Sequence, residues 1–252
     1  MIRVTYPAPS PEMANYVQGI FVLEHQEYSS FRLPLFANGT PALVFHNAKE
    51  MPANSHLTLF GQTISPDELL LKGKFTLIAY FLRPWCLPSL FRLAGSELTD
   101  NPVDFSLISK DRNLEEKLLN AVTTKQMLSL LDDHIARLAT CSSPEDPRSK
   151  YAAARIISNP QLDVLTSLRK DLYITERSFQ RVFRKNIGVS PNQFRRIIQF
   201  NNAFRQLNER KFSNLSDIAF NNGYADQSHF NRAFREFTNL TAMQYLHSCP
   251  SI

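Results

Sequence analysis

The stretch ERSFQRVFRKNIGVSP, residues 176–191, has a counterpart in QSHFNRAFREFTNLTA, residues 227–242. Four pairs of residues are identical at a constant offset, and they are Phe179 and Phe230, Arg181 and Arg232, Phe183 and Phe234, and Arg184 and Arg235. In both copies the apolar residues recur at intervals of three and four, which is the spacing of one face of an α-helix. The sequence therefore predicts two equivalent amphipathic helices.

The opposite faces of these two helices are polar and rich in side chains that can read DNA bases. They carry Arg177, Gln180, Arg181 and Arg184 in the first copy, and Gln227, Ser228, Asn231, Arg232 and Arg235 in the second. Arginine can donate two hydrogen bonds to guanine, and glutamine or asparagine can pair with adenine in a similar bidentate way. We therefore predict that these are the DNA-binding residues of the chain.

Each basic helix follows a shorter helical segment and a turn. The shorter segments are residues 164–172 and 216–222, and Ser216 or Asp217 is the expected N-cap of the second one. Gly223 then allows a sharp turn, because glycine takes a positive φ without penalty. A helix, a tight turn and a basic helix, present twice, predict two helix-turn-helix units.

The residues between the two units, 191–207, predict one long helix that starts at Pro191 after Ser190. Such a helix would set the distance between the two basic helices. Two helices that read one face of DNA must lie roughly 34 Å apart to enter successive major grooves.

The region from about residue 151 to 246 resembles the DNA-binding domain of the AraC family of transcription regulators. The matching signatures are FQRVFRKNIGVSP (179–191) and LSDIAFNNGYADQSHFNRAFREF (215–237). The resemblance implies a cytoplasmic bacterial regulator that binds operator DNA, with RNA polymerase as a candidate partner. It also implies base-reading positions, which are Arg177, Gln180 and Arg181 in the first unit and Gln227, Ser228, Asn231 and Arg232 in the second.

Three positions depart from the family pattern. Arg169 stands where a small residue is usual and Tyr173 where glycine is common, which leaves the packing of the first unit open. After the second unit, Asn239 begins a segment that is usually Gly-x-Ser-Pro. Asparagine can adopt the left-handed conformation, so we expect this turn to be retained.

The charge of the chain is divided unevenly. Residues 1–147 carry 12 Lys and Arg against 16 Asp and Glu, whereas residues 148–252 carry 16 against 7. A basic half beside an acidic half suggests that one domain alone contacts nucleic acid. The length of 252 residues allows two medium-sized domains.

The first 110 residues predict a β-rich domain. Short apolar runs at 42–45, 57–60 and 75–82 are bounded by turn-forming residues, which favours a barrel or a sandwich. The segments FANGTPALVFH (36–46) and FGQ (60–62) resemble a sensor-like domain of some AraC-type regulators, which implies a cupin-like barrel with a small-molecule effector. Eight aromatic residues could line its pocket or simply fill it, and they are Phe21, Phe31, Phe36, Phe45, Phe60, Tyr80, Phe81 and Trp85.

The expected fold class is α+β, in three parts. A β-barrel-like sensor domain covers residues 1–110, a helical segment covers 111–140, and an all-α double helix-turn-helix domain covers 150–252. The apolar side of the helical segment, which breaks near Thr123 and Thr124, is expected to form a homodimer. The alternative is that its Leu118, Leu131 and Ile135 only cover the β-rich domain or contact the DNA-binding domain.

Other kinds of site find little support in the sequence. The three cysteines are widely spaced, and His25, His46 and His56 do not form a compact ligand set, so no metal or cofactor is expected. No signal peptide, membrane span or common catalytic motif is found, so no catalytic residue is predicted. The alternative is an enzyme tethered to DNA, such as a DNA-repair alkyltransferase, which would need Cys86 to be reactive.

We predict that residues 150–252 alone bind a specific duplex DNA. The affinity should fall steeply with salt, because Lys and Arg contacts to phosphates release counterions. Selection from a random duplex library, followed by binding measurements over a salt series, tests this. The absence of any preferred sequence would contradict it.

Overall fold

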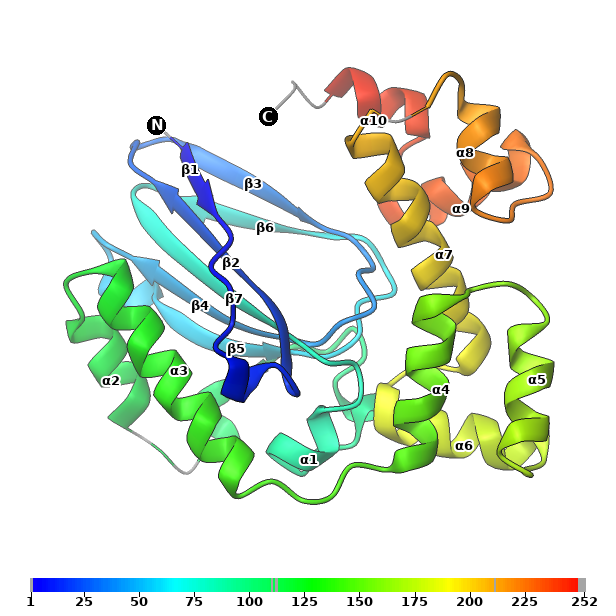
Figure 1. Cartoon of the computed structure of the whole chain (residues 1–252). Helices are drawn as coiled ribbons and strands as arrows, with labels where there is room; N and C mark the ends of the chain where they lie inside the picture. Colours follow the sequence, from blue (N-terminus) through cyan, green and yellow to red (C-terminus); the bar gives the residue numbers. More distant parts are fainter. Residues whose placement is uncertain (1, 110, 112, 211, 249–252) are drawn as a thin grey trace.

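The computed structural model describes residues 2–109, 111, 113–210 and 212–248. Figure 1 shows a β-rich half beside a helical half, with the long helix α7 (Pro191–Asn208) running through the helical half. The predicted α+β fold class is confirmed, with the strands in the first half of the chain and the helical repeats in the second. None of the described helices is long and apolar enough to cross a membrane.

The β-rich half contains two antiparallel sheets. The larger sheet has the order β1-β2-β7-β4-β5-β8, and β3 pairs with β6 in the smaller one. The strands are β1 Ile2–Thr5, β2 Val17–His25, β3 Ser30–Leu35, β4 Ala42–Ala48, β5 His56–Phe60, β6 Asp67–Lys72, β7 Phe75–Leu82 and β8 Val103–Asp104. The three predicted apolar runs lie in β4, β5 and β7. The arrangement is an open two-sheet sandwich, one of the two architectures that the sequence favours.

Strand β7 is the central strand and is covered on both faces. Ile78, Tyr80 and Leu82 face the helices, whereas Leu77 and Ala79 face the β3–β6 pair. A strand that is buried on both faces reads as a continuous apolar run rather than an alternating one. This explains the sequence FTLIAYFL of β7.

Helices α2 and α3 cover one face of the larger sheet (Figure 1). The helical segments of the β-rich half are η1 Pro11–Met13, η2 Pro52–Asn54, α1 Leu87–Phe91, η3 Gly95–Glu97, η4 Phe105–Leu107, α2 Asn113–Asn120 and α3 Thr124–Thr140. The predicted break at Thr123 and Thr124 is confirmed, because Thr123 is the N-cap of α3 and accepts a hydrogen bond from the Gln126 amide.

The apolar stripe of α2 and α3 packs inside the chain, and the expected homodimer stays a prediction. Leu118, Leu131 and Ile135 are completely buried in one core with the larger sheet. The exposed apolar side chains of this region are Leu119 and Val122, which do not continue the stripe. The stripe therefore stabilises the β-rich half, as the alternative interpretation holds.

The helical half follows the predicted order. It comprises α4 Pro147–Ser158, α5 Val164–Asp171, α6 Glu176–Ile187, α7, α8 Leu215–Asn221, α9 Gln227–Thr238 and α10 Ala242–Ser248. Helices α5 and α6 form the first helix-turn-helix unit, and α8 and α9 form the second. Helix α7 joins the two units (Figure 1), as the sequence predicts.

The β-rich half contacts both units. Near the first unit, Thr99 donates a hydrogen bond to the Gly188 carbonyl at 2.9 Å, and a Cβ on Gly95 would lie only 2.6 Å from the Gly188 nitrogen. Near the second unit, Ala37 is completely buried, and the Phe36 ring lies 5.6 Å from that of Phe204 on α7. Two hydrophobic cores thus contain residues from both sides of the predicted boundary between the β-rich half and the helical half. The domain boundaries stay a prediction.

We predict that Leu131→Glu unfolds the β-rich half and does not yield a folded monomer. The substitution removes a completely buried side chain and places a charge in its position, which should cost about 4 kcal/mol or more. Thermal unfolding of the full chain, followed by circular dichroism, measures the loss.

The matched control is Val122→Glu, between α2 and α3, where the side chain is 87% exposed. It should change the stability by no more than about 0.5 kcal/mol. A folded, fully stable Leu131→Glu variant would contradict the packing described here.

Candidate DNA-binding interface

Helix α6 presents the first predicted reading face to solvent. The Thr175 side chain accepts from the Ser178 amide and starts the helix, and Gly188, with φ 107°, ends it. Phe179, Phe183 and Ile187 are buried, so the helix is anchored along one side. All four predicted residues are exposed on the other side, namely Arg177, Gln180, Arg181 and Arg184. The geometry thus leaves this face free to enter a major groove.

Helix α9 presents the second face in the same way. The Asp226 side chain accepts from the His229 amide at 2.7 Å, and Phe230, Phe234 and Phe237 are completely buried. The exposed residues are Gln227, Ser228, Arg232 and Arg235, whereas Asn231 is half-buried. Base reading by these side chains stays a prediction, and Asn231 is the least accessible of the set.

The turns of the two units have the same positive-φ backbone conformation, but a different type of residue adopts it in each unit. Gly223 has φ 74°, as expected, but the corresponding residue of the first unit is Tyr173, with φ 50°. The Tyr173 side chain is 95% exposed, so it does not disturb the packing that the sequence left open. Asn239 adopts the left-handed conformation with φ 61° and retains the turn after α9, which confirms that expectation.

The expected N-cap of α8 is wrong. The cap is Asn214, whose side chain accepts from the Asp217 amide at 3.0 Å, while the Asp217 carboxylate accepts from the Asn214 amide at 3.1 Å. This reciprocal pair starts the helix two residues earlier than Ser216 would. The signal was present in the sequence as an asparagine followed three positions later by an acid.

Arg169 and Glu176 have a role that was not predicted from the sequence. Arg169 does not enter the core but pairs with Glu176 across the turn at 2.8 Å. The other carboxylate oxygen of Glu176 accepts a hydrogen bond from the side-chain amide of Gln180 at 3.2 Å. The carboxylate therefore orients Gln180 at the start of the reading face, and the spacing of four between Glu176 and Gln180 could have indicated this.

A second missed feature is a buried polar chain through α7 that connects the two units. Arg195, which is 6% exposed, donates to the Pro160 carbonyl at 3.1 Å and to Gln199 at 3.2 Å. Gln199 in turn donates to the Asn222 carbonyl of the second unit at 2.9 Å. Burial lowers the pKa of Arg195, but an arginine stays charged at neutral pH, so its hydrogen bonds are strong ones.

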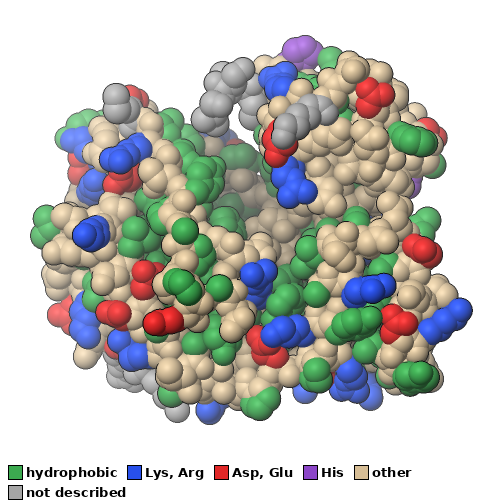
Figure 2. Space-filling model, viewed as in Figure 1, with side chains coloured by type: hydrophobic (Ala, Val, Ile, Leu, Met, Phe, Trp, Pro, Cys, Tyr) green, Lys and Arg blue, Asp and Glu red, His purple; other side chains and the backbone are tan. Residues whose placement is uncertain are grey.

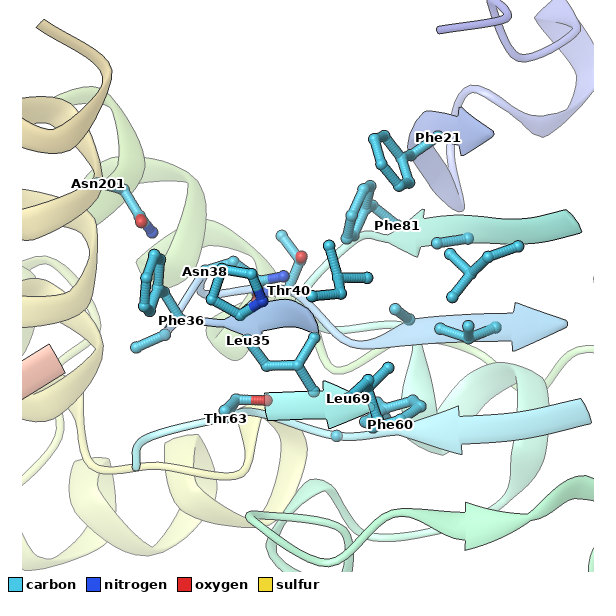
Figure 3. Close-up of a pocket in the computed structure, with 18 of the residues that line it drawn as sticks. Phe21, Leu35, Phe36, Asn38, Thr40, Phe60, Thr63, Leu69, Phe81 and Asn201 are labelled. Carbon is cyan, nitrogen blue, oxygen red and sulfur yellow. The ribbon is translucent and has the colours of Figure 1, made fainter. Parts of the chain in front are cut away.

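A cavity of about 360 Å³ lies between the two sheets and α7. Figure 3 shows Asn201 of α7 pointing toward Phe36 at one side of it. In the space-filling view a hollow separates the β-rich half from the second unit, and hydrophobic side chains line its sheet side (Figure 2). Of the eight predicted aromatic residues, the ones that line the cavity are Phe21, Phe36, Phe60 and Phe81. The others lie in the hydrophobic cores.

The histidines of the β-rich half are not arranged as a metal site. His46 and His56 lie with ring centroids 5.2 Å apart, and burial together with His56 lowers the pKa of His46 to about 4. His25 instead hydrogen-bonds the Gly73 carbonyl at 2.9 Å. In the described part of the chain, no three His, Cys, Asp or Glu side chains are grouped to hold a metal ion.

Cys86 lacks the surroundings of a reactive thiol. It is completely buried, and its sulfur lies 3.7 Å from the Tyr16 carbonyl. Burial raises the pKa of the Cys86 thiol, and the nearby Glu145 raises it further. A nucleophilic cysteine needs the opposite shift, because the thiolate is the reactive form.

Two family models match the chain. One for helix-turn-helix domains matches residues 168–248, and one for a domain of unknown function, DUF6597, matches residues 6–104. An uncharacterised helix-turn-helix-type transcriptional regulator of Haemophilus influenzae is 30% identical over 102 residues. That alignment covers 40% of this chain and 34% of the relative, so it spans about a third of the relative's length.

Similar solved structures include those of ToxT from Vibrio cholerae. ToxT of strain O395 bound to (E)-4-(8-methylnaphthalen-1-yl)but-3-enoic acid has a TM-score of 0.48 at 11% identity, over 98% of each chain. ToxT of strain SCE256 bound to an unsaturated fatty acid has a TM-score of 0.44 at 12% identity, over 92% of this chain and 96% of that one.

The two repeated units and the matching family model define the class, because the C-terminal half is a double helix-turn-helix domain. The two repeats that resemble the AraC family lie within the region that the helix-turn-helix model matches. The helix-turn-helix model and the Haemophilus relative both point to transcription regulators rather than to enzymes.

We predict that Arg181 and Arg232 read bases, whereas Lys185 serves phosphate or solvent. Both arginines are exposed on the reading faces. Replacing either with alanine should therefore cost about 1–3 kcal/mol on the preferred site and relax the preference at one base pair. Binding to a panel of single-base variants of that site measures both effects.

Lys185→Ala is the control on α6, because it removes a charge from the same exposed helix. It should weaken binding to all sequences alike and reduce the salt dependence by about one counterion. An equal, sequence-independent loss for all three variants would refute the assignment.

Proposed function

We propose that this protein is a sequence-specific DNA-binding transcription regulator that is controlled by a small molecule in its β-rich half. The observation that carries the proposal is the pair of exposed basic faces on α6 and α9, each held by a buried apolar side. The charge division of the chain supports it, since the excess of Lys and Arg lies in the half with these faces. The regulator would act in the cytoplasm, where promoter DNA lies.

The fixed connection between the units supports binding as one body. Helix α7 carries buried residues that pack against both units, including Phe194 against the first and Phe200 against the second. The Arg196–Glu236 ion pair, at 3.0 Å, adds a direct link from α7 to α9. One chain would then contact two successive major grooves, so a homodimer is not required for a two-part site.

Control by an effector is supported by the cavity beside α7. Its size is within the range of small-molecule pockets, which are commonly apolar with a few polar groups.

RNA polymerase is the expected protein partner of a regulator bound at a promoter. A homodimer would need a surface other than the buried stripe of α2 and α3.

An enzyme tethered to DNA is the weaker candidate. The alkyltransferase reaction requires an accessible, activated thiol, and the burial of Cys86 opposes both conditions. The exposed cysteine among the described residues, Cys141, lies at the end of α3. We therefore propose no catalytic residue.

Selection of duplexes that bind the full-length protein from a random DNA library tests the proposal. We expect a bipartite site whose two parts are centred about 10 base pairs apart. Inserting five base pairs between the parts should turn one of them to the opposite face of the duplex. Affinity should then fall to that of a single unit, because α7 fixes the distance between the reading helices.

Arg232→Ala is the control for this geometry. It should weaken binding to the natural spacing but have little further effect on the expanded site, where the second unit is already disengaged. No preferred sequence, or a preferred sequence that tolerates the five-base-pair insertion, would contradict the proposal.

A further inference from the structure

The cavity beside α7 has walls from both halves of the protein. The two sheets and the segment from Leu33 to Thr40 supply most of them, and Asn201 and Phe204 of α7 complete them. Figure 3 shows Phe36 and Asn201 on one side, with Phe21 and Phe81 farther along the strands. A molecule in this cavity would thus touch the helix that joins the two helix-turn-helix units.

The chemistry of the walls restricts what can bind. Among the described residues that line the cavity there is no Lys, Arg, His, Asp or Glu. Five phenylalanine rings contribute to the walls, and the polar side chains are those of Asn38, Thr40, Thr63 and Asn201. A charged ligand would lose its water without gaining an ionic partner, whereas a neutral one could hydrogen-bond these amides and hydroxyls.

A neighbouring cavity contains charged residues, among them Lys72 and Lys74. It shares Val44, Phe60, Leu69 and Leu77 with the first cavity and includes Lys74. The Lys74 ammonium is already paired with Glu50 at 3.3 Å and with the Tyr28 hydroxyl at 2.7 Å. The Lys72 side chain is exposed to solvent, where an ion pair contributes little. A ligand long enough to reach either lysine would therefore gain little from carrying an acid.

The α7 side of the cavity leads directly to the second reading helix. The Phe204 ring lies 5.6 Å from Phe36 of the β-rich half, 6.1 Å from Phe234 of α9 and 5.1 Å from Tyr245 of α10. These rings form one continuous cluster from the cavity wall to the core of α9. A ligand that displaces or fixes Phe204 therefore acts on the helix that carries Arg232.

We propose that this cavity binds an uncharged, largely aromatic small molecule, and that its contact with Asn201 and Phe204 changes the affinity for DNA. The part that concerns DNA rests on the proposed regulatory function. The part that concerns ligand class does not, because binding can be measured without DNA.

A matched pair of fluorescent probes tests the ligand class on the full-length protein. N-phenyl-1-naphthylamine is uncharged, and 8-anilinonaphthalene-1-sulfonate has the same aromatic body with an added sulfonate. We expect saturable binding of the neutral probe and binding of the sulfonate that is about tenfold weaker or more, because the cavity cannot compensate the charge. Equal or tighter binding of the sulfonate would overturn the proposal.

The variant Asn201→Phe tests whether the probe binds in this cavity, because the larger side chain would extend from α7 and fill it. The control is Asn202→Phe, because Asn202 lies next to Asn201 on α7 but does not line the cavity. The first variant should lose binding of the neutral probe about tenfold or more, and the control should retain it. Thr63→Phe fills the cavity from the β-rich half and serves if Asn201→Phe does not fold. Unchanged probe binding in a folded cavity-filling variant would refute the site.

DNA affinity, measured on the selected duplex with and without saturating N-phenyl-1-naphthylamine, tests the coupling. We expect a change of about fivefold or more, in the range of ordinary allosteric coupling, in the wild type and in Asn202→Phe but not in Asn201→Phe. Probe binding with no change in DNA affinity would overturn the coupling alone. A protein that binds the probe but no duplex would instead overturn the regulatory function.

Discussion

The burial of helix α7 is the constraint on which the arrangement of the protein depends. Phe194 and Ile198 near its start belong to the core of the first unit, and Phe200 and Leu207 farther along belong to the core of the second. Both recognition helices are therefore positioned by the same rigid element. Since a straight α-helix rises 1.5 Å per residue, the length of α7 sets how far apart the two faces can lie.

The β-rich half is packed onto α7 as well, which makes the three parts interdependent. A Cβ on Gly39 would lie 2.9 Å from the Ile198 side chain, so the loop that carries Phe36 and Ala37 approaches α7 very closely. Gly39 has φ 72°, a conformation that other residues adopt at a cost. The loop thus needs glycine for its shape and for its fit. A change in the sandwich can reach both units through this one contact surface.

The helical repeats could be predicted from the sequence because their signal is periodic. Phenylalanines at intervals of four, with arginines between them, specify a helix and its buried side at once. The long helix after Ser190 could be predicted for a similar reason, since proline and serine mark its start. The same pattern also predicts which polar side chains lie on the opposite, solvent-facing side of each helix.

Features that depend on distant contacts could not be predicted in this way. The sequence around Phe36 and Ala37 gives no sign that these residues enter the core of a domain that begins more than a hundred positions later. The apolar stripe of α2 and α3 has the same pattern whether it meets the sheet or a second chain, so periodicity alone could not identify its partner. Arg195 looks like a surface residue until the fold places the Pro160 carbonyl and Gln199 around it.

The contact between Gly95 and Gly188 is the place where the β-rich half and the end of α6 approach each other backbone to backbone. Here backbone meets backbone, and a Cβ on Gly188 would lie 2.9 Å from the Gly95 oxygen. The side chains of Thr99 and Gln62 also lie beside Gly188, so the space around this glycine is filled on several sides. A side chain at either glycine would therefore force α6 away from the β-rich half, and the closeness of this join depends on the absence of two β-carbons.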